Sequence, residues 1–420
     1  MNRGEGEKKI LFLLTYNFPW GDDHEFLVDE INYLATTFTE IHIVPLRSQA
    51  KQTHKIPANV VVTGFPSEKN LWKKLRLLFL ADWPDVLEEF KNISSRYHLR
   101  RNTKLFKTAV SSYLRALDIS HFLSKKLKKI NSQKIFVYAF WNDTSALSVA
   151  IIKKHYPQVT AFSRAHRFDV YADRNELNYL PFTFLKFRFL DAVFFVSEDG
   201  RNYSLRQFPF IDISKTKMNR LGVELIPTIN IKKSKKKLII LSIGFFLEVK
   251  RISLIAESLA LIDDTEIEWF HIGEGFGDVA SYREQVKHIL KSSKNVTYNL
   301  LGNMNKSEVI SFFQNQYIDL LVSVSSSEGI PVSMMEAMSA GIPVMGTDVG
   351  GVAEIVKDGY NGILLPPNPN AAFIANSLKE FYSMPEDQKE KFREHAFITW
   401  QKKFNAAINY PAFMKQVLNL

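Results

Sequence analysis

The sequence predicts an α/β protein built from two Rossmann-like, doubly wound parallel sheets. Short apolar runs of strand length alternate with amphipathic helical stretches, a pattern typical of parallel strands joined by crossover helices. A chain of 420 residues is also too long for one hydrophobic core and suits two domains. Its hydrophobic content of 46% and mean hydropathy of −0.12 are those of an ordinary soluble globular protein.

The domain boundaries follow from where these patterns start and stop. We predict a first domain over residues 1–223, opening with the buried strand Ile10–Leu14. Residues 224–237 contain Pro227 and a run of five lysines and one serine, so we expect a linker there. The second domain is predicted over residues 238–399, starting with the apolar strand Leu238–Gly244.

The composition excludes several classes of protein. Without cysteine the chain can form no disulfide framework and no thiolate metal site. The run Ile10–Leu14 is short and leads into Thr-Tyr-Asn-Phe-Pro, which indicates a buried strand and not a signal peptide. No run approaches the ~18 apolar residues of a membrane-spanning helix. We therefore expect a protein of the cytoplasm, or one that lies against a membrane.

The positive charge is concentrated in one segment. The chain has a formal net charge of +10, and residues 67–134 hold sixteen Lys and Arg against six Asp and Glu, which equals the whole excess. Such asymmetry indicates an anionic partner surface. The basic helix predicted at residues 70–80 places Leu71, Trp72, Leu75, Leu78 and Phe79 on one face, as in interfacial membrane helices. Alternatives are a helix packed on its own domain, or nucleic-acid binding, for which we find no recognised module.

The segment from Ser325 to Val344 carries the clearest chemical pattern. It follows the apolar strand Tyr317–Val324, and Pro331 suits the start of a helix that Gly341 ends. The N–H groups of Val332 and Ser333 then have no partner inside the helix and form an anion site, well suited to phosphate.

Two glutamates bracket this predicted anion site. Glu328 lies in the loop before the helix, and Glu336 lies past its first turn. Carboxylates on both sides of a phosphate site can accept hydrogen bonds from hydroxyl groups, which describes the binding of a sugar nucleotide. The alternative is an ordinary loop followed by an exposed helical glutamate.

A second polar cluster follows the predicted strand Val159–Phe162. Arg164, His166, Arg167 and Asp169 crowd one loop at the end of this strand. Histidine titrates near neutral pH and arginine can chelate phosphate, so the loop suits acid/base or phosphate chemistry. The alternatives are a structural or metal-binding histidine, with Asp169 capping the next helix.

These motifs resemble a known family. Glu-x₇-Glu, followed by Ala-Met-Ser-Ala-Gly-Ile-Pro-Val, resembles the donor-site signature of the retaining family-4 glycosyltransferases, and the similarity continues through Gly350–Val356 and Asp358–Leu365. Ser163–Tyr171 resembles the Ser-Arg-x-His-x-x-Asp-x-Tyr segment of a polysaccharide branch of that family. The resemblance implies the GT-B fold, in which two Rossmann-like domains face across a cleft. It also implies that a C-terminal helix at about residues 400–420 packs back on the first domain.

The resemblance implies a donor site in the second domain. There Glu336 would hold the ribose, the catalytic Glu328 would hold a sugar hydroxyl, and Lys250 would neutralise the diphosphate. The usual family arginine is replaced by Phe245, and Arg251 is the candidate substitute. The remaining predicted donor contacts are Gly244, Asn303, Met304, Gly329, Ile330, Pro331, Val332 and Ser333. No metal and no cofactor are expected, and no Asp-x-Asp motif is present.

For the first domain the resemblance implies an acceptor side. His166 would be catalytic and would contact the transferred sugar. Trp20 and Gly21 follow the first strand, and with Arg164 and Asp169 they are candidates for the acceptor or phosphate side. Trp20 has the alternative of a loop residue folded onto the core.

The predicted function is a retaining, metal-independent, hexosyltransferase-type enzyme (EC 2.4). It would move a sugar from a nucleotide sugar to a saccharide or polyprenyl-linked acceptor in cell-surface polysaccharide biosynthesis. The enzyme would be peripheral on the inner face of the cytoplasmic membrane and bind no nucleic acid. The alternatives are a nucleotide-sugar epimerase or phosphorylase on the same fold, and a non-catalytic partner that retains the fold.

Overall fold

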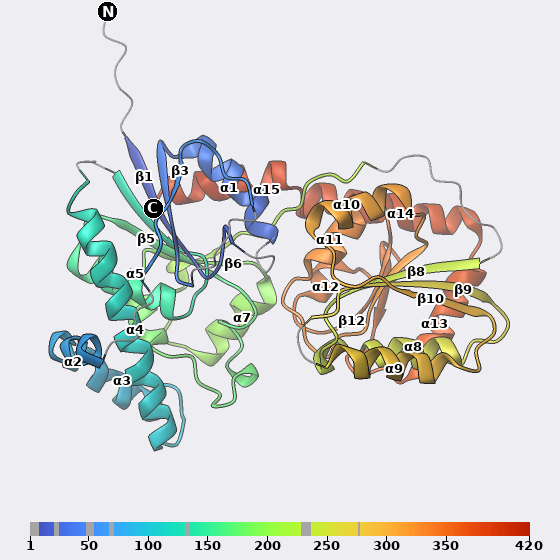
Figure 1. Ribbon diagram of the computed structural model, residues 1–420, viewed down its shortest axis with the longest axis horizontal. Helices are drawn as coiled ribbons and strands as arrows, with labels where there is room; N and C mark the ends of the chain where they lie inside the picture. The colour runs from blue at the N-terminus through green and yellow to red at the C-terminus, as the bar shows by residue number, and fades with distance from the viewer. Residues whose placement is uncertain are drawn as a thin grey trace, which may run out of the picture. The chain divides into compact units, whose positions relative to one another are not determined.

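The computed structural model describes residues 8–20, 25–47, 54–66, 71–130, 134–227, 237–275 and 278–420. The chain divides into two compact units (Figure 1). Unit 1 consists of Met1–Arg220 and Tyr410–Leu420, and unit 2 consists of Leu221–Asn409. Two α/β units built on parallel sheets confirm the predicted fold class.

Unit 1 contains, within its described residues, a seven-stranded parallel sheet of order β3-β2-β1-β4-β5-β6-β7. Its strands are β1 (Lys9–Thr15), β2 (Glu40–Pro45), β3 (Val60–Val62), β4 (Lys134–Ala139), β5 (Thr160–Ala165), β6 (Ala192–Phe195) and β7 (Thr216–Met218). Its helices are α1 (Glu25–Thr37), α2 (Leu71–Leu80), α3 (Trp83–Ser95), α4 (Thr103–Leu127), α5 (Thr144–His155), α6 (Thr183–Phe189) and α7 (Glu198–Gln207).

The central strand β1 is buried on both faces, which explains its continuous apolar sequence. Ile10, Phe12 and Leu14 pack with residues of α3, α4 and α5. Leu11 and Leu13 face the opposite way, toward α1 and the C-terminal helix α15 (Ala406–Leu418). Alternation along a strand sends successive side chains to opposite faces, so a doubly covered strand must be apolar throughout.

The C-terminal end of the chain returns to unit 1 at Tyr410. The ring of Tyr410 lies 5.3 Å from that of Tyr33, and Phe413 packs against Phe194 at 4.8 Å. Residues 400–409 belong to unit 2 instead, because Trp400 donates from Nε1 to the backbone oxygen of Val223. The return therefore begins ten residues later than predicted. Residues 221–223, predicted in the first domain, belong to unit 2. Most of the predicted linker, residues 228–236, lies outside the described residues.

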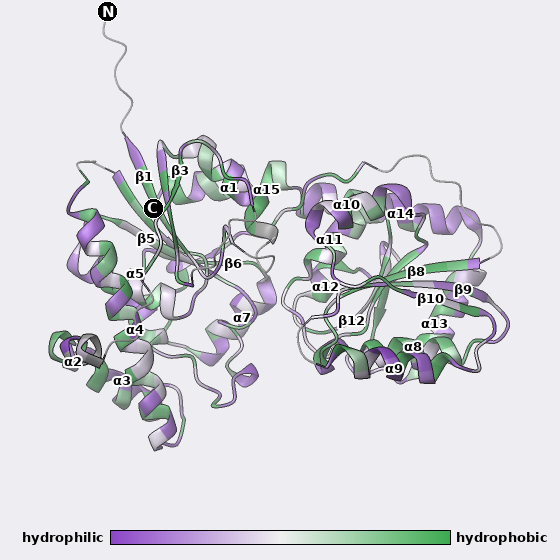
Figure 2. Cartoon of the chain, in the orientation of Figure 1, coloured by the Kyte–Doolittle hydropathy of each residue, from purple (hydrophilic) through white to green (hydrophobic). Residues whose placement is uncertain are grey.

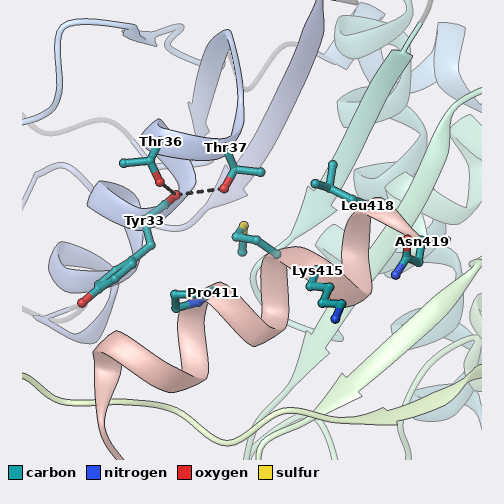
Figure 3. A pocket seen from close by; sticks show the side chains of 8 residues that line it. Tyr33, Thr36, Thr37, Pro411, Lys415, Leu418 and Asn419 are labelled. Atoms are coloured by element: carbon teal, nitrogen blue, oxygen red, sulfur yellow. Dashed lines mark hydrogen bonds between the residues drawn. The ribbon is translucent and has the colours of Figure 1, made fainter.

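A pocket of about 380 Å³ lies between α1 and α15 (Figure 3). Tyr33, Thr36 and Thr37 line it from α1, and Pro411 and Met414 are among the residues that line it from α15. Helices that follow parallel strands run back along the sheet, so the end of α1 lies at the amino ends of the strands. The pocket is thus remote from the loops at the carboxyl ends, where ligands bind in such sheets.

Unit 2 contains, within its described residues, a six-stranded parallel sheet of order β10-β9-β8-β11-β12-β13. Its strands are β8 (Lys237–Ile243), β9 (Glu266–Ile272), β10 (Val296–Leu300), β11 (Leu320–Ser323), β12 (Val344–Thr347) and β13 (Gly362–Leu365). Its helices are α8 (Ile252–Ala260), α9 (Val279–Leu290), α10 (Lys306–Asn315), α11 (Val332–Ser339), α12 (Val352–Ile355), α13 (Ala371–Ser383) and α14 (Glu386–Lys403).

Helices cover both faces of the second sheet. Figure 1 shows α8, α9 and α13 on one face and α10, α11 and α14 on the other. The central strand β8 is accordingly hydrophobic along most of its length (Figure 2). No helix within the described part of the chain is long and apolar enough to cross a membrane.

Helix α3 is attached to unit 1 through buried carboxylates. Glu89 accepts hydrogen bonds from the hydroxyls of Tyr97 (2.9 Å) and Tyr179 (2.6 Å) and from the backbone N–H of Phe182 (2.7 Å). Nearby, Lys154 of α5 donates to Asp85 at 2.8 Å. Burial raises the pKa of Glu89 to about 7, because its hydrogen bonds only partly offset the cost of removing the charge from water.

We expect this shift to make stability depend on pH. The carboxyl of Glu89 titrates near its ordinary value of 4.5 when unfolded and near 7 when folded, so stability is lost as pH rises through that window. Glu89→Gln should remove this loss. As pH rises from 5 to 8, the free energy of unfolding of the variant relative to that of wild type should therefore increase by on the order of 1–2 kcal/mol. Urea unfolding at both pH values measures the difference. A constant difference between the two proteins would contradict the assignment.

Candidate functional site

The carboxyl ends of β8 and β11 form the topological switch point of unit 2. From β8 the chain continues to β9 and β10 toward one edge of the sheet, and from β11 it continues to β12 and β13 toward the other. Sheets of this kind bind ligands at the loops that follow the two strands at such a point. Lys250 lies in the loop after β8, and Glu328 lies in the loop after β11. Residues 78 positions apart are thereby brought to one place.

Lys250 and Glu328 form an ion pair at this switch point. The Nζ of Lys250 lies 2.6 Å from Oε1 of Glu328, whose side chain is only 8% exposed. The lysine stem crosses Gly244, where an added Cβ would lie 3.4 Å from Lys250 Cδ. Burying two charges costs desolvation energy, so such a pair is poor evidence of stabilisation and points instead to a role in binding.

The N-terminus of α11 lies next in the chain to Glu328. Gly329, Ile330 and Pro331 are buried, and no side chain caps the helix at Pro331. Val332 and Ser333 begin the helix and are partly exposed, so their N–H groups are presented at a helix end that carries positive potential. Pro331 directly precedes the first helical residue, Val332, and its side chain can accept no hydrogen bond.

Glu336 lies one turn into α11 and is buried, with 8% exposure. Its spacing of four residues from Val332 puts both on the same side of the helix. The structure therefore does not place Glu336 on the solvent, as the alternative interpretation required.

Two glycines hold the Glu328 loop in place. The N–H of Gly351 donates to the backbone oxygen of Gly329 at 2.9 Å. Gly350 has a φ of 56°, and an added Cβ there would lie 1.9 Å from the backbone oxygen of Glu328. Only glycine permits this approach, which explains the glycine at position 350.

Arg251 makes hydrogen bonds within unit 2. Its guanidinium donates to the backbone oxygens of Val324, Ser325 and Pro367 and to the side chain of Asn368. These bonds tie the loop after β11 to the segment after β13. Arg251 follows Lys250 in the chain, but the direction of its side chain depends on the packing of loops distant in sequence.

Asn303 also has a supporting role in the structure. Its side-chain oxygen accepts from the N–H groups of Glu274 (2.8 Å) and Gly275 (3.3 Å), so it links the loops after β9 and β10. Met304 follows it and is partly exposed. Both residues lie beyond the carboxyl end of β10, at the edge of the sheet that carries Lys250.

Unit 1 has a polar pair at its own switch point, between β1 and β4. Tyr16 follows β1, and its hydroxyl donates to the carboxylate of Asp143, which follows β4 and caps α5. Burial, with the nearby charge of Asp143, raises the pKa of Tyr16, so the phenol stays protonated. Neither residue belongs to a motif in the sequence, although both lie in loops that follow strands.

His166 lies beyond β5 and is held by its neighbours. The centroid of its ring lies 4.5 Å from that of Trp141 and 4.9 Å from that of Phe140. The backbone N–H of His166 donates to the carboxylate of Asp169 at 2.6 Å. Asp169 also accepts from the N–H of Asn142. It therefore joins the loops after β4 and β5 and does not cap a helix.

The buried Asp169 lies close to a buried cation. Burial and the proximity of Asp143 raise the pKa of Asp169 to about 7. Lys186 of α6 lies near both carboxylates and donates from Nζ to the backbone oxygen of Asn142 at 2.6 Å. No motif in the sequence signals Lys186, because its position depends on how α6 packs on α5.

Arg164 lies in the core, which corrects its assignment to the acceptor or phosphate side. It lies within β5, is fully buried, and pairs with Glu30 of α1. It also donates to Asn219 at 3.0 Å, and its guanidinium lies 4.2 Å above the ring of Phe413. Arg164 lies inside the strand and His166 lies in the loop beyond its end, so the two side chains have different neighbours.

The remaining acceptor-side candidates lie in loops after the first strands. Trp20 is partly buried, and its N–H donates to the backbone oxygen of Asn17. Gly21 lies outside the described residues. Phe168, two residues beyond His166, is 65% exposed and was not predicted. An exposed ring in a strand-end loop can stack on a sugar face, but a single phenylalanine gives no sequence signal of that role.

The two units define the class of the protein: their paired Rossmann-like sheets form the GT-B fold. Over 99% of the chain, the structure is similar to HepE of Anabaena, solved in complex with UDP and glucose (TM-score 0.69, 15% identity, all of that chain covered). It is also similar to sucrose-phosphate synthase of Thermosynechococcus elongatus (TM-score 0.70, 14% identity, 98% of this chain and all of that one).

Sequence comparison finds a family match in the second half. Residues 228–397 match the model of the family described as Glycosyl transferases group 1. An uncharacterized glycosyltransferase of Methanocaldococcus jannaschii is 34% identical over 141 residues, which are 33% of this chain and 36% of that protein. The putative colanic acid biosynthesis glycosyltransferase WcaL of Salmonella typhimurium is 34% identical over 117 residues, 27% of this chain and 28% of that protein. The chain thus spans about a third of the length of these relatives.

Proposed function

We propose that the protein is a retaining glycosyltransferase that moves a sugar from a nucleotide sugar to a saccharide acceptor. The observation that carries this proposal is the ion pair of Lys250 and Glu328 beside the uncapped N-terminus of α11. A cation and free N–H groups favour a diphosphate, and the carboxylates of Glu328 and Glu336 can accept hydrogen bonds from hydroxyls.

The geometry supports a separate role in the reaction for each of these groups. As the bond between the anomeric carbon and the diphosphate oxygen breaks, its electron pair stays on the diphosphate. Lys250 and the N–H groups of Val332 and Ser333 would stabilise that charge. The acceptor hydroxyl forms the new bond to the anomeric carbon, and its proton passes to the departing phosphate or to solvent. We propose that Glu328 orients the sugar and Glu336 holds the ribose.

The finer features of the reaction rest on chemistry and resemblance. The charges of Lys250 and the helix end could replace a metal, so we propose that transfer proceeds in EDTA. Retention follows from the resemblance of Ser325–Val344 to a retaining signature. We propose a lipid-linked acceptor, bound in the cytoplasm, because WcaL of Salmonella typhimurium is named for colanic acid biosynthesis. On the acceptor side we propose the loop that carries His166.

A ligand panel tests the proposal. UDP-, GDP- and ADP-sugars are screened by thermal shift, and we expect one family of nucleotide sugars to raise the melting temperature. Glu336→Ala should weaken that binding about 10- to 100-fold, as the loss of a hydrogen bond to a charged group predicts. The donor found is then supplied with lipid-linked saccharides, and the anomeric configuration of the product is read by NMR.

The same assays separate the alternatives. An epimerase would convert the donor without an acceptor, and a phosphorylase would require inorganic phosphate. Binding without transfer to any acceptor would favour a non-catalytic partner, an alternative that the phenylalanine at position 245 and the structural use of Arg251 keep relevant. Stabilisation by no nucleotide sugar would overturn the proposal.

A further inference from the structure

Helix α3 buries carboxylates beside apolar side chains and exposes other apolar side chains. Its inner face carries Glu89, only 1% exposed, and the buried Asp85, together with the core residues Val86 and Ile93. Its outer face carries Trp83, Leu87 and Lys91, four residues apart and all exposed. A helix anchored by carboxylates and directing tryptophan and leucine to solvent is not explained by the packing of its own domain.

Helix α2 extends this apolar surface. Trp72 is 78% exposed and Phe79 is 89% exposed, and Leu80 at the end of the helix is exposed as well. The indole N–H of Trp83 donates to the backbone oxygen of Leu78, which joins the end of α2 to the start of α3. Figure 2 shows hydrophobic and hydrophilic residues mixed along both helices.

The start of α4 completes the surface. The exposed ring of Phe106 stacks on that of Phe90 of α3, with centroids 4.5 Å apart. Both α2 and α3 contact α4, so the three helices hold these side chains on one scaffold. We call the exposed residues the apolar plate: Trp72, Phe79, Leu80, Trp83, Leu87 and Phe106.

The charges around the plate are one-sided. Residues 71–107 contain nine Lys and Arg and four Asp and Glu. All four acids are engaged inside unit 1: Asp85 and Glu89 are buried, Asp82 pairs with Lys154 and Glu88 pairs with Arg188. Exposed basic side chains in the same segment are Arg76, Lys91, Arg100, Arg101 and Lys107, and Lys104, which pairs with the exposed Glu176. What this surface presents outward is therefore apolar and cationic.

We propose that the apolar plate docks on the interface of an anionic lipid bilayer. Tryptophan and phenylalanine rings enter the boundary between headgroups and acyl chains, and the surrounding lysines and arginines contact anionic headgroups. A bilayer satisfies both features at once, because one partner supplies the apolar layer and the negative charge. This binding goes beyond the proposed transfer reaction and does not depend on it.

Co-sedimentation of the full chain with lipid vesicles tests the proposal. Vesicles of phosphatidylcholine alone are compared with vesicles that contain one part phosphatidylglycerol in three. We expect binding to the anionic vesicles, weakened by salt. The double variant Trp72→Ser/Phe79→Ser should lower the partition coefficient roughly tenfold or more, since both side chains are largely exposed and would enter the interface. Lys91→Gln and Lys107→Gln should each lower it roughly fivefold.

Matched variants in unit 2 control for nonspecific effects. Phe373→Ser removes an aromatic side chain that is 48% exposed, and Lys287→Gln removes a lysine that is 66% exposed. Both should bind as wild type does, and circular dichroism should show all variants folded.

Three outcomes would overturn the proposal: no binding to anionic vesicles, equal binding to neutral ones, or equal losses in the unit 2 controls. A dimer in light scattering that the double variant dissociates, without vesicle binding, would assign the plate to a second copy of the chain. Because no outcome uses activity, failure here is distinguishable from failure of the proposed transferase.

Discussion

Alanine in place of Lys250 is expected to lower kcat/KM for glycosyl transfer by about 10²–10³-fold, in line with the loss of one charged group from a preorganised site. The lysine is held at the β8–β11 switch point by Glu328, 2.6 Å away, so its charge is already in place when the diphosphate departs. Because that charge develops in the transition state, most of the loss should appear in kcat. Steady-state kinetics with the donor identified by thermal shift measure it.

Two further variants make this prediction specific. Lys287→Ala removes an exposed lysine of the same unit and should leave kcat/KM within about twofold. Glu328→Gln keeps a hydrogen-bonding group but removes the charge that holds Lys250. Its kcat/KM should lie between those of wild type and Glu328→Ala. Unchanged transfer by Lys250→Ala and Glu328→Ala would show that this pair is structural and that the donor binds elsewhere.

Alanine in place of Glu30 is expected to lower the free energy of unfolding by about 3–5 kcal/mol. Glu30 and Arg164 are both fully buried, so removing the carboxylate leaves a guanidinium in the core without its counter-charge. Urea unfolding of the full chain, followed by tryptophan fluorescence, measures the loss. The transition that shifts should be that of unit 1, and donor binding by unit 2 should persist.

The exposed pair of Lys104 and Glu176 supplies the control. Glu176 is 79% exposed, and Glu176→Ala should cost less than about 1 kcal/mol. The double variant Glu30→Met/Arg164→Met, which fills the space with apolar side chains, should recover much of the loss. Equal, small effects of Glu30→Ala and Glu176→Ala would show that water reaches the Arg164 side chain.

The fold was predictable because its signals are local. Apolar runs such as Leu238–Gly244 and intervening helical stretches are properties of neighbouring residues, and they predict parallel sheets before any contact is known. The exposed apolar residues of α3 were not predictable, because the orientation of the helix depends on Glu89 meeting two tyrosines and an N–H in the core. The basic excess of residues 67–134 did indicate an anionic partner surface.

In the candidate site, too, some residues were predictable from local sequence and others were not. Glu328, the start of α11 and Glu336 lie in one continuous segment, so local rules for helix ends placed them relative to one another. Arg164 and Arg251 were assigned to sites because arginine binds phosphate, yet one pairs with Glu30 in the core and the other binds backbone oxygens. Tyr16 and Asp143 were overlooked because 127 residues separate them.

The sequence by itself determined the two α/β units, the helix end between two glutamates, and the absence of cysteine chemistry. These depend on side-chain periodicity, on unpaired N–H groups and on composition, none of which requires long-range contacts. The tertiary structure decided which charges meet: Lys250 with Glu328 at the switch point, and Arg164 with Glu30 in the core. A long cation can reach several partners, and only the packing of strands and loops distant in sequence selects one of them.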